Sequence, residues 1–324
     1  MNGSASARAL GALALAAGCL STCTRPRELP PCDESPALPV APKDPAAAVI
    51  VAAGDIAECP GGRQEETAAL VEQIGPDAVF TLGDTTYPNG ELDEFLDCYH
   101  PSWGKFRSIT RAVVGNHEYH ALRAGPFFAY FCGGAGASFE GRASFDIGAW
   151  HVVMLNSNCG GDLDVPSSVP DDFGGCGPDS PQARWLKEDL AAHPSRCTLA
   201  MWHHARFTSG EHGSADSMRD SWRILQDAGV DVVLAGHAHL YERFAPMNAD
   251  GQIDVVRGMR GFVVGTGGKV PLHAVDEVHN GSEVRNIDTL GVLRLELRSE
   301  GYTWRFVPVS GGSFTDEGEA PCHD

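Results

Sequence analysis

The feature that most limits how this chain can fold is a series of apolar, strand-length segments that each end in polar side chains. These segments are 47–55, 77–84, 109–116, 198–204 and 231–237. Each is short and continuously apolar, which is typical of a β-strand buried on both faces. The polar residues at their ends are Asp55, Asp84, Asn116, the pair His203 and His204, and His237, with His239 two residues further on.

Helical patterns lie between these segments. Residues 63–75 place apolar side chains at helical spacing before a terminating glycine, and 180–194 begins with a serine cap and a proline at the first helical position. Further helices are predicted at 92–98 and 216–229. The remaining β patterns are 142–158, read as two strands joined by a tight turn, and several segments after Gly261. Strands that alternate with helices predict an α/β fold with parallel neighbouring strands.

The polar residues at the strand ends are expected to converge, because ligands in open α/β sheets bind at the carboxyl ends of the strands. Individually, each residue has an ordinary explanation. A Gly-Asp pair is a common turn or helix cap, Asn116 suits a left-handed turn, and a lone histidine or Tyr87 can pack in the core. Five strand ends that carry carboxylates, an amide and imidazoles are not explained in that way. The sequence therefore predicts one metal site.

Charge limits the ligand class. The chain has 324 residues and a formal net charge of −19, so most of its surface would repel a nucleic acid. We therefore expect no wrapping of nucleic acid. A small phosphate ester can still bind if metal cations reverse the sign of the charge inside a cleft.

The N-terminal region has the pattern of an export signal. Residues 1–23 contain one arginine, an alanine-rich apolar stretch and then small residues, as in a secretory signal peptide. The stretch LALAAGC also resembles a bacterial lipoprotein cleavage site with Cys19 as the acylated residue, and an ordinary cleaved signal fits equally well. Residues 24–46 are rich in proline and predict a linker, and 47–324 a single domain. The predicted location is extracytoplasmic, either secreted or lipid-anchored at a bacterial envelope, with the lipid anchor as the only membrane contact.

Ten cysteines in an exported chain indicate disulfides. Cys19 and Cys23 lie near the predicted cleavage site, and the even number that remains fits an oxidising compartment. None of the cysteines forms a CxxC pair, which argues against a thiolate zinc site. Cys159 and Cys176 flank one loop and are the expected local pair, whereas the sequence leaves the other pairings open.

The strand-end residues also form motifs. GDxxY stands at Gly83–Tyr87, GNHE at Gly115–Glu118 and GHxHxYER at Gly236–Arg243. In these blocks the chain resembles the binuclear metallophosphoesterase (calcineurin-like) superfamily, and within it the purple acid phosphatase branch. The chain departs from the pattern at Ala57, where that branch has glycine, and at Ala205, where it has proline.

The resemblance implies a fold and a site. The fold would be a four-layer α/β/β/α sandwich, with two β-sheets flanked by helices and the metals at the C-terminal ends of strands. A ferric ion would bind one half of the site and a zinc, manganese or ferrous ion the other. The implied ferric ligands are Asp55, Tyr87, His239 and the bridging Asp84, and the divalent ligands are Asp84, Asn116, His203 and His237. Anionic oxygens suit a trivalent ion, and an amide with two imidazoles suits the divalent one.

Two further histidines receive roles from the resemblance. His117 would hydrogen-bond the substrate or the bridging group, and His212 would protonate the leaving group, with a plain surface histidine as the alternative for His212. The expected protein is an exported phosphatase that hydrolyses small phosphomonoesters by attack of a metal-bound hydroxide. One alternative is a phosphodiesterase or nucleotide-cleaving enzyme of the same superfamily. Another is a surface lipoprotein that binds metal without catalysis.

Overall fold

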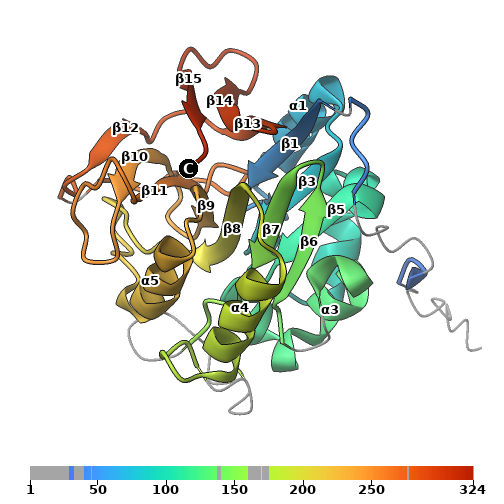
Figure 1. Cartoon of the computed structure of the whole chain (residues 1–324). Helices are drawn as coiled ribbons and strands as arrows, with labels where there is room; N and C mark the ends of the chain where they lie inside the picture. Colours follow the sequence, from blue (N-terminus) through green and yellow to red (C-terminus); the bar gives the residue numbers. More distant parts are fainter. Residues whose placement is uncertain are drawn as a thin grey trace, which may run out of the picture.

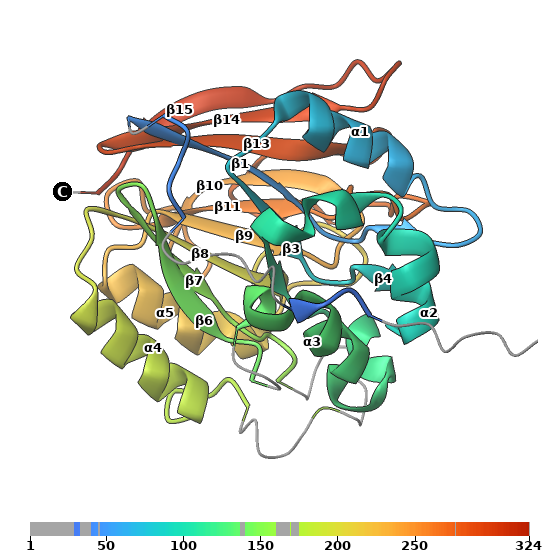
Figure 2. The same cartoon turned by 90° about the vertical axis from the view of Figure 1, so that its right-hand side faces the viewer.

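Two β-sheets lie face to face and carry helices on their outer sides (Figures 1 and 2). The computed structural model describes residues 29–32, 40–44, 46–136, 140–159, 169, 175–275 and 277–323. The predicted signal peptide, with Cys19 and Cys23, lies outside these residues. Among the helices that the structure describes, none has the length and apolar character needed to cross a membrane.

The first sheet has six strands in the order β15-β14-β13-β1-β3-β5. β1 and β3 are parallel, as are β3 and β5, whereas β13 runs antiparallel to β1. The strands are β1 (Ala47–Ala53), β3 (Ala78–Leu82), β5 (Thr110–Val113), β13 (Gly291–Arg298), β14 (Gly301–Pro308) and β15 (Glu317–Pro321). The parallel part is the βαβ unit predicted from the sequence.

The second sheet has seven strands in the order β12-β10-β11-β9-β8-β7-β6, of which β11, β9, β8 and β7 are parallel neighbours. Its strands are β6 (Ala143–Ile147), β7 (Trp150–Met154), β8 (Cys197–His204), β9 (Val232–Gly236), β10 (Tyr241–Met247), β11 (Met259–Val264) and β12 (Ser282–Asn286). β6 and β7 form the tightly connected pair predicted within 142–158. A two-stranded parallel ladder of β2 (Ala57–Glu58) and β4 (Thr86–Tyr87) lies near the strand ends.

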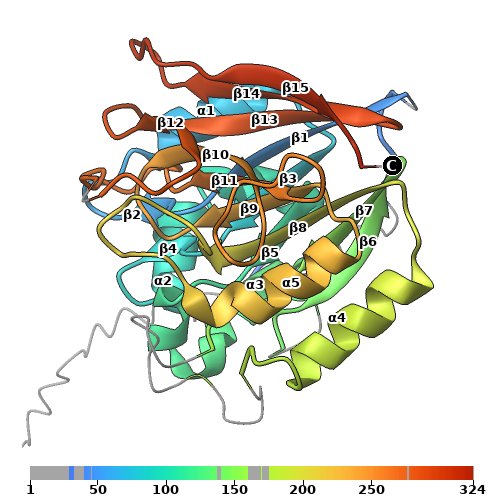
Figure 3. The same ribbon diagram turned by 60° about the vertical axis from the view of Figure 1, so that its left-hand side comes forward.

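The helices cover the outer faces of the sheets. α1 (Gln64–Ile74) packs on β13 of the first sheet, and α4 (Pro181–Ala192) and α5 (Arg219–Asp227) lie side by side under the second (Figure 3). α2 (Leu92–Glu94) continues as a π-helix over Phe95–Tyr99. α3 (Gly125–Phe131) was not predicted. Short 3₁₀ helices occupy Trp103–Ile109, His117–His120, Leu122–Ala124, Cys132–Ala135 and Asp216–Met218. The four-layer sandwich is confirmed.

Local sequence explains the boundary of α4. The Ser180 side chain accepts a hydrogen bond of 3.1 Å from the Ala183 N–H, and Pro181 occupies the first turn, where its missing N–H costs nothing. This is the predicted cap. Burial fixes the strands instead: Ile50 in β1, Phe80 in β3 and Leu234 in β9 are fully buried in the layer between the sheets.

Four disulfides join distant parts of the described chain. The Cys159–Cys176 pair expected from the sequence is confirmed. The others are Cys32–Cys132, Cys59–Cys98 and Cys197–Cys322. The described parts of the predicted linker are held to the domain, because Cys32 is bonded to Cys132 and the Val40 N–H donates to Asp146 O at 3.0 Å.

A buried histidine joins β6, β7 and α4. His151 Nδ1 lies 2.8 Å from Asp146 Oδ1, and its Nε2 lies 3.0 Å from Asp189 Oδ2. Burial lowers the pKa of His151, but the two carboxylates outweigh it and raise the pKa above its ordinary value. Burial raises the pKa of Asp189, but the interaction with His151 outweighs burial, so the pKa of Asp189 is lowered.

We expect His151→Gln to destabilise the protein more at pH 5.5 than at pH 8.5. Because the pKa of His151 is higher in the folded state, the protonated histidine stabilises the fold at pH values below its unfolded-state pKa. This stabilisation is lost as pH rises through the folded-state pKa. At pH 5.5 Asp189 is ionised in both states, so the pair is intact and its loss costs about 2 kcal/mol. Urea unfolding at both pH values measures this, and a cost that grows with pH would contradict the assignment. The exposed His120→Gln, outside this cluster, serves as the control.

Candidate metal centre

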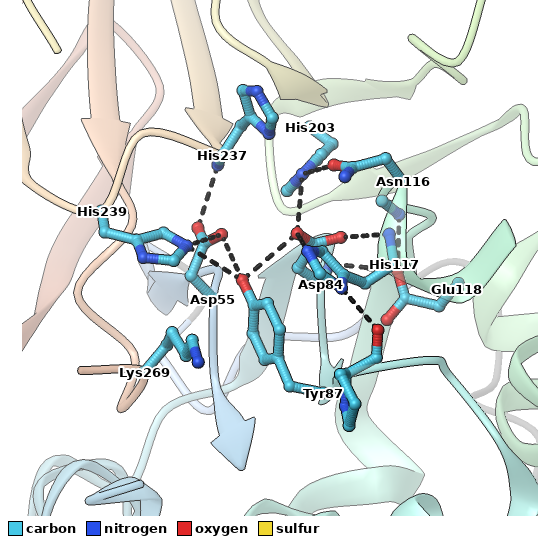
Figure 4. Close-up of polar contacts among 12 residues, drawn as sticks. Asp55, Asp84, Tyr87, Asn116, His117, Glu118, His203, His237, His239 and Lys269 are labelled. Carbon is cyan, nitrogen blue, oxygen red and sulfur yellow. Dashed lines mark hydrogen bonds and ion pairs between the residues drawn. The ribbon is translucent and has the colours of Figure 1, made fainter. Parts of the chain in front are cut away.

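The seven predicted ligands come from the carboxyl ends of neighbouring strands in both sheets (Figure 4). The residues are Asp55 after β1, Asp84 after β3, Tyr87 in β4, Asn116 after β5, His203 in β8, and His237 and His239 after β9. All seven are buried, with at most 6% of their surface exposed. The structure therefore brings together every ligand position that the sequence predicted.

Three of the seven have strained backbone. Asp55, Asp84 and His237 have φ angles of 60°, 48° and 68°, in the left-handed region that residues with a Cβ rarely adopt. Each directly follows a glycine at the end of its strand. Such strain costs about 1–3 kcal/mol per residue and is concentrated at functional sites. The turn aims each side chain back across the strand ends and explains the repeated glycine–ligand pattern.

Two glycines allow these loops to approach one another. A Cβ on Gly83 would collide with the ring of His203, and one on Gly115 would collide with the carboxylate and backbone nitrogen of Asp84. Gly83 also has a φ of 83°. The glycines in GDxxY and GNHE therefore set the distance between adjacent ligands.

One half of the centre is built around the phenol of Tyr87. Its oxygen lies 2.8 Å from Asp55 Oδ1, 3.1 Å from His239 Nε2 and 3.2 Å from Asp84 Oδ2. Burial and the two carboxylates raise the pKa of Tyr87 well above its ordinary value. Ionising this phenol therefore requires a strong positive charge placed among these four side chains.

The other half is built around His203. Its Nδ1–H donates to the Leu82 carbonyl at 2.7 Å, which leaves Nε2 facing Asn116 Oδ1 at 3.0 Å and Asp84 Oδ2 at 3.3 Å. Burial lowers the pKa of His203, but Asp84 outweighs it and raises the pKa to about 9. A ring nitrogen that faces two oxygen acceptors needs either a proton or a metal between them.

His237 completes this half as a neutral imidazole. Burial and the adjacent His204 and His203 hold its pKa well below the ordinary value, and the neutral form is the one that binds metals. His203, His204 and His237 offer ring nitrogens within 4.8 Å of one another. Of the adjacent pair His203 and His204, the resemblance gave the ligand role to His203. The Nε2 of His204 is buried without a hydrogen-bond partner, while its Nδ1 lies 2.8 Å from the Ser157 hydroxyl.

Asp84 lies between the halves and is shared by them. Its Oδ2 is close to both Tyr87 and His203, and ligand atoms of Asp55, Asp84 and His203 lie within 4.8 Å of one another. Two carboxylates buried this close together are unfavourable unless cations match their charge. The donor set fits two metal ions, a hard one among carboxylates and phenol and a borderline one among amide and imidazoles.

Glu118 fixes the position of Asp84 from behind. Its buried carboxylate accepts hydrogen bonds from the N–H groups of Asp84 at 3.0 Å, Thr85 at 2.6 Å and Gly115 at 2.7 Å, and from the Thr85 hydroxyl at 2.7 Å. Burial and the charge of Asp84 raise the pKa of Glu118. These bonds hold the backbone around Asp84, so that Glu118 orients the ligand loop. Arg243, the last residue of the GHxHxYER motif, forms ion pairs with Asp316 and Glu283.

A cavity of about 600 Å³ opens onto the centre. His117 and His212, the two predicted catalytic histidines, both line it. The His117 Nδ1 lies 2.7 Å from the Pro88 carbonyl, and its Nε2 lies 3.9 Å from Asp84 Oδ2. The His212 ring lies 4.6 Å from that of His237, between centroids. The structure thus favours the site position of His212 over a remote surface position.

Three residues that line the cavity were missed by sequence reasoning, namely His120, Lys269 and His273. His273 stacks on His239 with centroids 4.0 Å apart, and its N–H donates to His239 O at 2.8 Å. Burial lowers the pKa of His273 to about 4, helped by His239 and His212. The sequence signal for this segment was the glycine pair Gly267–Gly268. A Cβ on either glycine would meet a backbone oxygen of the Asp55 loop at 2.5 Å, so the pair allows the segment to pack closely beside the site.

The chain matches the model of the calcineurin-like phosphoesterase family over residues 48–241, more than half of its length. The chain belongs to this family. Among curated proteins it is 28% identical to purple acid phosphatase 22 of Arabidopsis thaliana over 56% of this chain and 43% of that protein. It is also 28% identical to tartrate-resistant acid phosphatase type 5 of Mus musculus, over 77% of this chain and 80% of that protein.

Solved structures share the fold. Purple acid phosphatase PPD1 from yellow lupin seeds aligns with a TM-score of 0.67 and 17% identity, over 87% of this chain and 55% of that one. GAP50, the anchor in the inner membrane complex of Plasmodium, aligns with a TM-score of 0.63 and 13% identity, over 86% of this chain and 90% of that one. The chain spans about half the length of the plant phosphatases it matches. Sequence similarity to purple acid phosphatases places the chain with that branch of the family, and the solved structures show the shared fold.

We expect Glu118→Gln to lower the free energy of unfolding by about 2 kcal/mol, since the amide would turn an N–H group toward donors that need an acceptor. It should also weaken metal retention about 10-fold by releasing Asp84. Urea unfolding and metal analysis after dialysis against a chelator measure the two effects. The exposed Glu188→Gln on α4 is the matched control. Unchanged stability in Glu118→Gln would show that Glu118 does not hold the loop.

Proposed function

We propose that this protein is an exported binuclear-metal phosphatase that hydrolyses phosphomonoesters. The observation that carries the proposal is the position of Asp84 between two complete groups of ligands, since a bridging carboxylate holds two cations at the short separation that in-line displacement at phosphorus needs. Family membership and the purple acid phosphatase relatives support the same reaction class. The four disulfides support folding in an oxidising compartment outside the cytoplasm.

We assign a ferric ion to Asp55, Tyr87, His239 and Asp84, and a zinc, manganese or ferrous ion to Asp84, Asn116, His203 and His237. Three oxygen donors, the Tyr87 phenol and the carboxylates of Asp55 and Asp84, support the trivalent assignment. The neutral imidazole of His237 and the amide of Asn116 support the divalent one. When bound, such ions lower the pKa of water and neutralise charge that develops on the phosphoryl oxygens.

The protein's own residues position and protonate the substrate. His117 lies at the mouth of the divalent half, where its Nε2 can donate to a phosphoryl oxygen. His212 faces His237 and His239 from the opposite wall and can protonate the leaving alkoxide. Its loop is anchored by the buried Glu242, which accepts from the Ser209 N–H at 2.8 Å.

The cavity is wide enough to leave a second reaction open. A volume of about 600 Å³ also accommodates a phosphodiester or a nucleotide, which makes diester cleavage the alternative activity. A non-catalytic surface lipoprotein is the less favoured reading, because no ligand of the seven is replaced. A lipid anchor on Cys19 belongs to the same proposal and is tested by mass spectrometry of the membrane-associated protein.

We expect Asp84→Asn to lose both metal ions and to reduce hydrolysis of phenyl phosphate by more than about 10³-fold. The amide keeps the shape of the side chain but removes the charge that two cations share, and even one lost electrostatic contact costs 10²–10³. Metal analysis and steady-state rates measure this, with the exposed Asp227→Asn as control. Full activity in Asp84→Asn would refute the site. Diphenyl phosphate is assayed in parallel, and a large preference for it would replace the monoester assignment.

We expect His212→Ala to lower kcat/KM for an alkyl phosphate about 10²-fold and to affect 4-nitrophenyl phosphate much less. A poor leaving group needs a proton in the transition state, whereas 4-nitrophenolate leaves without one. Comparison of the two substrates measures the effect, and His193→Ala is the control outside the cavity. Equal losses on both substrates would assign His212 to binding instead of proton transfer.

A further inference from the structure

An ion pair lies against the ring of Tyr87. Lys269 lies beside Tyr87 (Figure 4), with its Nζ 4.9 Å from the centroid of the ring. The same Nζ lies 2.5 Å from Glu58 Oε1. Both side chains are largely shielded from water, with 20% and 26% of their surface exposed. Neither residue belongs to the proposed ligand set or to the motifs of the sequence. Lys269 also lies beyond the segment matched by the family model.

The backbone holds the pair in this position. Glu58 is the register partner of Tyr87 in the ladder of β2 and β4. The Lys269 N–H donates to the Asp55 carbonyl at 2.9 Å, and the Gly267 N–H donates to Gly54 O at 2.9 Å. The backbone of Lys269 is therefore tied to the loop that carries Asp55, and its ammonium reaches both the Tyr87 ring and Glu58 from there.

We propose that the Lys269–Glu58 pair sets how much electron density Tyr87 gives to the ferric ion, and so tunes the colour and the reduction potential of the site. This inference rests on the proposed function, in which Tyr87 is a ferric ligand. A cation over an aromatic ring stabilises the electrons of that ring, and more so where water is excluded. Lys269 lies over the ring, so it acts on the phenolate more strongly than on the metal beyond the oxygen.

The two partners act in opposite directions. Lys269 lowers the energy of the phenolate electrons, which moves the charge-transfer band to shorter wavelength, and its positive charge favours reduction of iron. Glu58 offsets part of both effects, because its carboxylate is in direct contact with the ammonium. A merely structural ion pair predicts the same disturbance from the loss of either partner, whereas tuning predicts opposite shifts.

The test compares iron-loaded wild-type protein with Lys269→Met, Glu58→Gln and the double variant. Iron content is measured on each sample, followed by the visible spectrum and a reductive titration. We expect Lys269→Met to move the band to longer wavelength and lower the reduction potential, Glu58→Gln to do the reverse, and the double variant to return toward wild type. Lys269→Arg should keep the wild-type band, and the exposed Lys105→Met controls for loss of a remote charge.

Each outcome decides one of the two proposals. Opposite shifts support the tuning role, and the Glu58→Gln arm stands by itself if Lys269→Met does not fold. A purple protein whose band and potential are unchanged in both variants, or shifted in the same direction, overturns it and leaves the ferric site intact. A wild-type protein that binds iron without a charge-transfer band overturns the assignment of Tyr87 itself, and the tuning role with it.

Discussion

The charge of two carboxylates buried between the sheets is the constraint on which the rest of this site depends. Asp55 and Asp84 are essentially without solvent contact, and an uncompensated buried charge costs several kcal/mol. The surrounding residues compensate the charge of the two carboxylates in two ways. His203 takes a proton readily because Asp84 raises its pKa to about 9, and the convergent phenol, amide and imidazoles offer cations a complete set of donors. A metal ion and the His203 proton therefore compete for the same space.

The same constraint explains why strained backbone is retained at Asp55, Asp84 and His237. A carboxylate can reach the shared space only if its strand ends abruptly and the chain reverses through a left-handed residue. The Asp55 N–H donates to Gly83 O, the Asp84 N–H to Glu118 and the His237 N–H to Asp55 Oδ2. Each of the three strained residues is therefore held by a neighbouring strand end. Two large sheets with fully buried strands supply the packing that offsets this strain.

The sequence predicted the parts of the protein that local patterns encode. Apolar runs gave the parallel strands, and serine and proline gave the start of α4. The strand-end residues predicted a metal site, and the resemblance to the phosphoesterase family implied its seven ligands. The residues it missed depend on contacts between distant segments. His273 belongs to the site only because its segment is hydrogen-bonded to His239, and three of the four disulfides join cysteines at least 39 residues apart. No local periodicity records such contacts. His204 was named with His203 at the end of its strand but given no ligand role, and the structure places both rings against His237.

The sequence motifs supply the ligands, whereas other loops supply the wall of the cavity, and this difference has a physical origin. The ligands must sit at strand ends, because only there do side chains from both sheets converge. A similar fold occurs in GAP50, the anchor in the inner membrane complex of Plasmodium, so the fold by itself does not fix an activity. The wall of the cavity is free to come from any loop that reaches the edge. In this chain part of it comes from the segment after β11, and glycines there allow backbone to pack on backbone beside Asp55. Lys269 and His273 are therefore held against the ligand loops by backbone hydrogen bonds to Asp55 and His239, although neither belongs to the ligand set.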